Sequence, residues 1–242
     1  GSNLSTILDV LAYNTYINSY NANMISNEVF IDSATLRENV VALARNIGYV
    51  PRSRKAARAK ISFTVSGLED TSTLTLNAGL ICNGAGQNTN YIFSIPEDIT
   101  VPVTNGVADF SEVQIFEGTF VTQSFTVDTS LGNQKFILDN SFIDTSTIKV
   151  KVFPSQSSSS SVTYKQIDNI VGVTSTSSSY LLQEIEDERY ELIFGDDVIA
   201  KKLSNDNYIT VSYIITDGKS GNGAAQFSFI GNVVDQDGAT ID

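Results

Sequence analysis

The spacing of the apolar residues changes once along this chain, and the change divides it into a helical part and a β-rich part. In the first fifty residues, apolar side chains recur with a helical period. After residue 58 they alternate with polar ones, as at Ile61, Phe63 and Val65. Turn signals such as Asn83-Gly84 and Asn105-Gly106 separate the alternating segments. The sequence therefore predicts a mainly β fold of the α+β class, built from sandwiches or barrels rather than a parallel sheet.

The N-terminal segment is expected to form two antiparallel helices. Asp32 and Ser33 offer an N-cap for the second helix, while Gly48 and Pro51 would end it. The apolar residues of the first helix are expected to share one face: Leu4, Ile7, Leu8, Leu11, Ile17, Tyr20 and Met24.

Four regions are expected along the chain. They are a helical hairpin over 3–50, a basic linker over 51–58, a first β subdomain over 59–117 and a second over 118–242. The boundary at Glu117-Gly118 is weak, so one or two antiparallel β-sandwich or barrel-like subdomains remain possible. The chain begins Gly1-Ser2 without an initiator Met, which we interpret as a sign of a fragment of a longer protein.

Composition excludes several kinds of catalysis. The chain has no histidine, so Ser-His-Asp and Cys-His nucleophiles and His-based metal sites are ruled out. Gly218-Lys219-Ser220 lacks the upstream glycine of a phosphate-binding loop, because Tyr213 stands in its place. Cys82 is expected to be a buried, inert thiol. We predict no catalytic, cofactor-binding or metal-binding residues, no cofactor and no small-molecule substrate.

Charge and hydropathy limit the kinds of partner that this chain can bind. A net charge of −12 argues against nucleic acid, and no apolar run reaches the length of a membrane span. The acidic run around Glu184 to Glu191 and the turn Asp235-Gln236-Asp237-Gly238 leave calcium binding as an alternative. The rival interpretation of the whole chain is a β-sandwich adhesin or a module that binds carbohydrate or calcium. A hydrolase that uses only carboxylates ranks third.

Two surfaces are candidates for protein–protein contact. Basic residues cluster before the first strand, either as a solvated linker or as a docking strip for an acidic partner. The apolar face of the first helix is expected to pack on a partner's helices or on the β domain. The expected assembly surface comprises Leu8, Leu11, Ile17, Met24, Arg52, Arg54, Lys55 and Arg58.

Three stretches carry a resemblance to a known family. The first holds Leu11 to Thr15, then Asn46, Gly48, Tyr49 and Pro51, then Ser53 to Ala57; the second is Val113 to Val127, VQIFEGTFVTQSFTV. The third pairs an FGDD turn with a TDGKSGNG turn, at Phe194, Gly195, Asp196, Asp197, Gly218, Gly221, Asn222 and Gly223. In this order the stretches resemble the baseplate J-like family, the wedge proteins of T-even-like contractile-tailed phages. The family usually has glycine at the position of Asp197.

The resemblance implies a structural role without enzymatic activity. Such proteins associate with themselves and with neighbouring wedge subunits, and the wedges close into a ring around the tail hub. That ring couples host contact to sheath contraction. The expected location is the tail baseplate of the virion, after assembly in the cytoplasm of the host bacterium.

Overall fold

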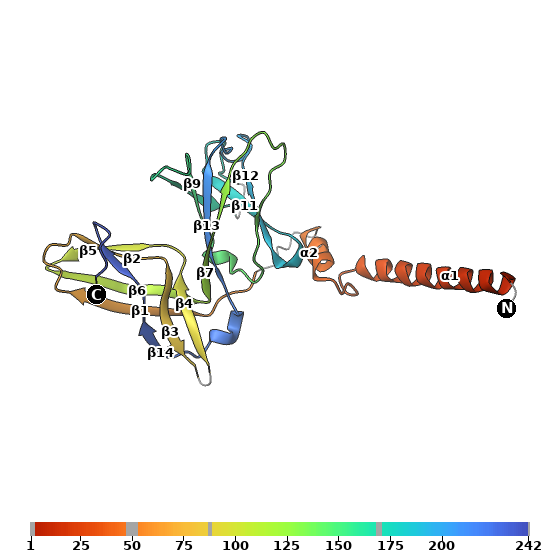
Figure 1. Ribbon diagram of the computed structural model, residues 1–242, viewed down its shortest axis with the longest axis horizontal. Coiled ribbons are helices and arrows are strands. Elements are labelled where there is room, and N and C mark those ends of the chain that lie inside the picture. The colour runs from red at the N-terminus through yellow and green to blue at the C-terminus, as the bar shows by residue number, and fades with distance from the viewer. Residues whose placement is uncertain (1–2, 47–52, 87–88, 168–170, 242) are drawn as a thin grey trace. The chain divides into compact units, whose positions relative to one another are not determined.

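The computed structural model describes residues 3–46, 53–86, 89–167 and 171–241 (Figure 1). The chain divides into two units, Gly1–Arg52 and Ser53–Asp242. The first unit is helical and the second contains two β-sheets. The predicted mainly β fold is confirmed.

Over residues 3–46, the described part of the first unit, two helices form, α1 (Asn3–Glu28) and α2 (Arg37–Asn46). Their expected antiparallel packing is not confirmed. With ten residues against twenty-six, α2 is too short to cover most of α1. Gly48 and Pro51, the expected end of the second helix, lie outside the described residues.

The expected N-cap of α2 is wrong. Asp32 and Ser33 lie in the turn after α1, where the Ser33 hydroxyl donates to the carbonyl of Asn27 at 2.6 Å. Glu28 binds the start of α2 instead. Its carboxylate accepts hydrogen bonds from the backbone N–H groups of Thr35 (2.9 Å) and Leu36 (3.3 Å).

The Glu28 carboxylate also accepts hydrogen bonds from side chains. The Asn39 amide donates at 2.7 Å and the Thr35 hydroxyl at 2.7 Å. These bonds, that of Asn39 foremost, lower the pKa of Glu28 to about 2, because they favour the charged form. The end of α1 and the beginning of α2 are therefore joined through one carboxylate.

The first sheet has eight strands. Its order is β14-β3-β4-β6-β5-β2-β15, and β1 pairs with β6. The strands are β1 (Arg58–Ser66), β2 (Thr73–Leu76), β3 (Gly79–Ala85), β4 (Asn90–Ile95), β5 (Ile99–Thr104), β6 (Val107–Glu117), β14 (Gln226–Phe229) and β15 (Val233–Asp235). The alternation read from β1 is confirmed, since Ile61, Phe63 and Val65 pack against the core that contains Phe110 and Ile115.

The two Asn-Gly signals have different outcomes. Asn105 and Gly106, with φ of 54° and 73°, form the tight turn between β5 and β6. Asn83-Gly84 was wrongly expected to be a turn and lies inside β3. There a Cβ on Gly84 would come within 2.6 Å of the Phe93 ring, so this glycine makes room for an aromatic side chain. Cys82, its neighbour in β3, is buried as expected.

The second sheet has seven strands in the order β7-β13-β9-β10-β11-β12-β8. They are β7 (Thr119–Thr126), β8 (Phe136–Leu138), β9 (Lys149–Phe153), β10 (Val162–Gln166), β11 (Ser179–Glu184), β12 (Tyr190–Phe194) and β13 (Tyr208–Ile215). All neighbours are antiparallel except β10 and β11, which are parallel. Its own core includes Leu138, Val150, Leu192 and Tyr213.

The chain passes between the two sheets at more than one place. At Glu117-Gly118, β6 of the first sheet ends and β7 of the second begins. The expected second subdomain ran on to residue 242, but β14 pairs with β3 and β15 with β2, so the chain returns to the first sheet. Alternation reveals which face of a strand is buried but not which sheet the strand joins.

Candidate functional site

The helix α1 exposes apolar side chains along its length. Leu8 and Leu11 are 57% and 56% exposed, Met24 is exposed, and Ile17 is half-buried. The other large apolar residues exposed on this helix are Leu4, Ile7, Val10, Tyr13, Tyr16, Tyr20 and Ile25. Large exposed apolar patches are typical of protein–protein interaction sites.

These residues do not share one face, contrary to the expectation from the sequence. Leu11 and Ile17 are six positions apart, so at 100° per residue their side chains point about 120° apart around the helix axis. The group near Leu8 and the group near Met24 therefore lie on different sides of α1. A helix that is apolar on several sides is typical of a buried helix.

Two basic residues at the start of the β unit, Arg54 before β1 and Arg58 at its first position, bind groups of their own chain. The guanidinium of Arg54 lies 3.8 Å from the ring centroid of Phe142, and its Nε lies 3.7 Å from a carboxylate oxygen of Glu188. Arg58 donates from Nη2 to the hydroxyl of Ser146 at 2.7 Å. Lys55 is exposed, and Arg52 lies outside the described residues. Arg54 and Arg58 therefore contact groups of their own chain, and the use of the strip as a docking surface stays a prediction.

Asp144 connects the segment before β1 to the second sheet through hydrogen bonds. Its side chain is fully buried; one carboxylate oxygen accepts the N–H of Ala56 at 2.9 Å, and the other accepts the N–H and hydroxyl of Ser146 at 3.0 and 2.6 Å. Its own N–H donates to the carbonyl of Ile214 in β13 at 3.0 Å. The sequence analysis did not single out Asp144, although an Asp two residues before a Ser is typical of an Asx turn.

A second contact joins the sheets around Glu117. The buried carboxylate of Glu117 accepts the hydroxyl of Thr216 at 2.6 Å, and burial raises its pKa. Its backbone N–H donates to the carbonyl of Ala57 at 2.8 Å. Gly221 lies against Glu117, since a Cβ there would be 2.5 Å from Glu117 Cγ.

Parts of all three resembling stretches therefore meet at one place. Ala56 and Ala57 belong to the first, Glu117 to the second, and Thr216 and Gly221 to the TDGKSGNG turn. We call this set, together with Asp144 and Gly118, the joint. Gly218 and Gly223 adopt positive φ of 75° and 98°, and a Cβ at either would meet nothing within 4 Å. The N–H of Asn222 donates to the carbonyl of Lys219 and so closes the turn.

The FGDD turn lies apart from the joint, at the end of β12. Phe194 packs on the core of the second sheet, and Gly195 touches the backbone of Ala200 so closely that a Cβ has no room. Asp196 accepts the N–H groups of Val198 and Ile199, both at 3.0 Å, which lowers the pKa of its carboxyl. These contacts stabilise the conformation of the turn itself.

Asp197 has a φ of 68°, the left-handed conformation in which glycine is favoured. We expect the Asp197→Gly variant to be more stable than the Asp197→Ala variant, with a free energy of unfolding about 1 kcal/mol higher. Glycine adopts a positive φ without steric cost, whereas alanine does not. Both variants lose the bond from Lys202 N to the carboxylate, and the site is exposed, so packing does not differ. Urea denaturation measures the difference.

Asp196 supplies the control for that pair, since its φ is not positive. There the order should reverse, with the alanine variant more stable than the glycine variant. The same order at both positions would contradict the conformational explanation.

Metal-binding groups and membrane-spanning helices are both absent from the part of the chain that the structure describes. Among the described residues, no group of three or more Cys, Asp or Glu side chains is placed to hold a metal ion. In the tail, Asp235 uses one carboxylate oxygen to accept the N–H groups of Asp237 and Ala239 at 2.9 and 2.8 Å. Neither described helix combines the length and the apolarity needed to cross a membrane.

The comparison with known proteins gives one clear similarity. No family model matches the chain. The chain is 28% identical over 248 residues to the baseplate wedge protein gp6 of Enterobacteria phage T4. The match covers 95% of this chain and 36% of the T4 protein, so the chain corresponds to about a third of that relative's length.

Proposed function

We propose that this chain is part of a structural subunit of a phage tail baseplate wedge and acts through protein–protein contacts. The observation that carries the proposal is the similarity to the T4 wedge protein, which extends over nearly the whole chain. The three resembling stretches add to it, because parts of them form one joint rather than separate surface turns.

The helix α1 is the proposed contact element. A helix in water gains little stability from its own backbone, so most helical stability in proteins comes from packing. Since α1 exposes apolar residues on more than one side, it needs covering on more than one side. We infer that helices of neighbouring subunits, including a second copy of this chain, provide that cover.

The β unit is the proposed rigid support. Buried polar contacts at the joint hold the two sheets together through Asp144 and Glu117. In the finer proposal, wedges built from such subunits close into the ring around the tail hub and couple host contact to sheath contraction. The subunit would then be made in the cytoplasm of the host bacterium and end in the virion.

Leu11→Asp tests the role of α1. A charge on the apolar surface should weaken association with neighbouring wedge subunits of the same phage at least about tenfold, because the carboxylate would have to be buried in the contact. Sedimentation velocity on the chain, alone and mixed with those subunits, measures this. Asn14→Asp adds the same charge to a polar position of the same helix and should change association by less than about twofold.

Unchanged association of the Leu11→Asp variant would remove α1 from the contact. If the chain did not associate with wedge subunits but its sedimentation changed when calcium was added, the result would instead favour a calcium-binding module.

A further inference from the structure

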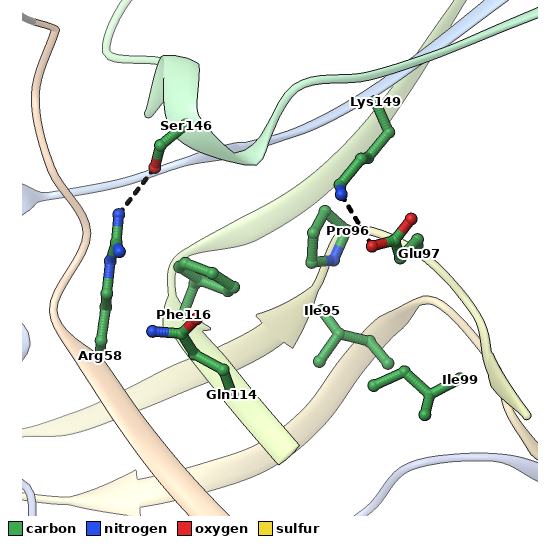
Figure 2. A pocket seen from close by; sticks show the side chains of 9 residues that line it. All are labelled: Arg58, Ile95, Pro96, Glu97, Ile99, Gln114, Phe116, Ser146 and Lys149. Atoms are coloured by element: carbon green, nitrogen blue, oxygen red, sulfur yellow. Dashed lines mark hydrogen bonds and ion pairs between the residues drawn. The ribbon is translucent and has the colours of Figure 1, made fainter. Parts of the chain in front are cut away.

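A pocket of about 300 Å³ opens in the β unit beside Arg58 (Figure 2). Strands of both sheets line it, namely β1, β4, β5 and β6 of the first and β9 of the second. Its full lining is Arg58, Ile95, Pro96, Glu97, Ile99, Gln114, Phe116, Ser146 and Lys149.

The pocket combines an apolar wall with cations. The half-buried Ile99 gives it apolar surface, together with the edges of Pro96 and Phe116, which are otherwise buried. Figure 2 shows Arg58 and Lys149 on opposite sides, with Phe116 and Pro96 between them. Polar and apolar groups thus contribute about equally to its lining.

Hydrogen-bond donors outnumber acceptors at the pocket. A guanidinium has five donors and an ammonium three. Arg58 donates to Ser146 at 2.7 Å and lies 3.7 Å from the buried carboxylate of Asp144. The oxygens of Asp144 already accept the N–H of Ala56 and both donors of Ser146, so they do not saturate the guanidinium.

Glu97 shows which group the pocket accepts. Its carboxylate pairs with the ammonium of Lys149 at 2.7 Å, with 48% of the Glu97 side chain exposed. A surface ion pair of this kind contributes little stability, so another carboxylate can replace it. The chain's own acid therefore occupies the position that an incoming carboxylate would take.

Size and charge together identify the occupant. A pocket of this volume holds one or two side chains rather than an extended ligand. We propose that it is a docking site for an acidic segment of a partner protein, in which an apolar side chain packs on Phe116 and Ile99 while the adjacent carboxylate binds Lys149 and Arg58. The inference rests on the proposed function only in taking the partner to be a protein of the assembly, and it does not involve α1.

The test uses the whole chain with its isoleucine methyl groups labelled for NMR. The probe is N-acetyl-leucyl-glutamate amide, and its uncharged counterpart is N-acetyl-leucyl-glutamine amide. The acidic probe should shift the methyl signals of Ile95 and Ile99 with millimolar affinity, and the counterpart should bind at least about fivefold more weakly. Equal binding of the two, or shifts spread over other isoleucines, would overturn the proposal.

Substitutions assign the binding to the pocket. Lys149→Gln should weaken the affinity for the acidic probe about fivefold. Glu97→Gln should raise that affinity about twofold, because it removes the competing carboxylate. Lys151→Gln is the matched control: it removes the same charge from the same face of β9 but does not line the pocket, and binding should stay within about twofold. Equal effects of the two lysine changes would show a general charge effect and refute the site.

Acetate separates a peptide site from an anion site. At the same concentration it should leave the methyl signals nearly unchanged, since it lacks the apolar part. If acetate matched the acidic probe, the pocket would be a simple anion site and the proposal would fall. Failure of α1 to associate would leave all of these readouts unaffected.

Discussion

Asp144→Ala should lower the free energy of unfolding by about 3–4 kcal/mol. The substitution removes three accepted hydrogen bonds and leaves the N–H of Ala56 buried without its partner. It also takes away the carboxylate beside the guanidinium of Arg58, at 3.7 Å. Urea denaturation followed by circular dichroism measures the loss.

Asp128→Ala is the matched control, because Asp128 makes the same local turn at the surface. Its carboxylate accepts the N–H and hydroxyl of Ser130 at 2.9 and 2.6 Å, as Asp144 does from Ser146. Asp128 is exposed and holds no distant segment, so its loss should be a small fraction of that at Asp144. Similar losses at both positions would mean that the turn, and not the tie to the strip before β1, accounts for the effect.

Gly118→Ala should cost more than about 4 kcal/mol, since it combines a steric clash with an unfavourable backbone conformation. Gly118 has a φ of 127°, and a Cβ there would lie 2.1 Å from the carbonyl oxygen of Ile215. The backbone cannot shift freely, because its N–H donates to Ile92 at 2.9 Å and its carbonyl accepts the hydroxyl of Ser94 at 2.8 Å. A lowered yield of folded protein and a lowered denaturation midpoint are the expected results.

Gly67→Ala separates the two causes. Gly67 also has a positive φ, 85°, but a Cβ there meets nothing within 4 Å. It should cost only about 1 kcal/mol, the penalty of the backbone conformation alone. If Gly118→Ala cost no more than Gly67→Ala, the close approach of β13 to this glycine would not matter for stability.

Local periodicity was enough to predict much of the β unit. The alternation over Ile61 to Val65 and the turn at Asn105-Gly106 depend on neighbouring residues, and both are confirmed. At Glu117-Gly118, where the sequence suggested a weak boundary, the chain passes from the first sheet to the second, although it later returns to the first.

Features that depend on distant residues were missed or mistaken. Asp144 is important because of Ala56, far away in the sequence, and no local pattern shows that. Asp32 and Ser33 have good capping side chains, but Glu28 instead binds the N–H groups of Thr35 and Leu36, immediately before the second helix. The prediction of a single apolar face on α1 was wrong for a different reason. The runs Leu4 to Leu11 and Ile17 to Met24 each follow the helical period, but the six-residue step between them does not, so the two runs lie on different sides of the helix.

Hydrogen–deuterium exchange of α1 tests the central claim, that this helix is covered by partner subunits, most directly. In the chain alone its amides should exchange rapidly, because its side chains are exposed. Mixed with neighbouring wedge subunits, they should slow at least about tenfold while the core strand β13 stays as protected as before. Complex formation that left α1 exchange unchanged, or no complex at all, would contradict the account.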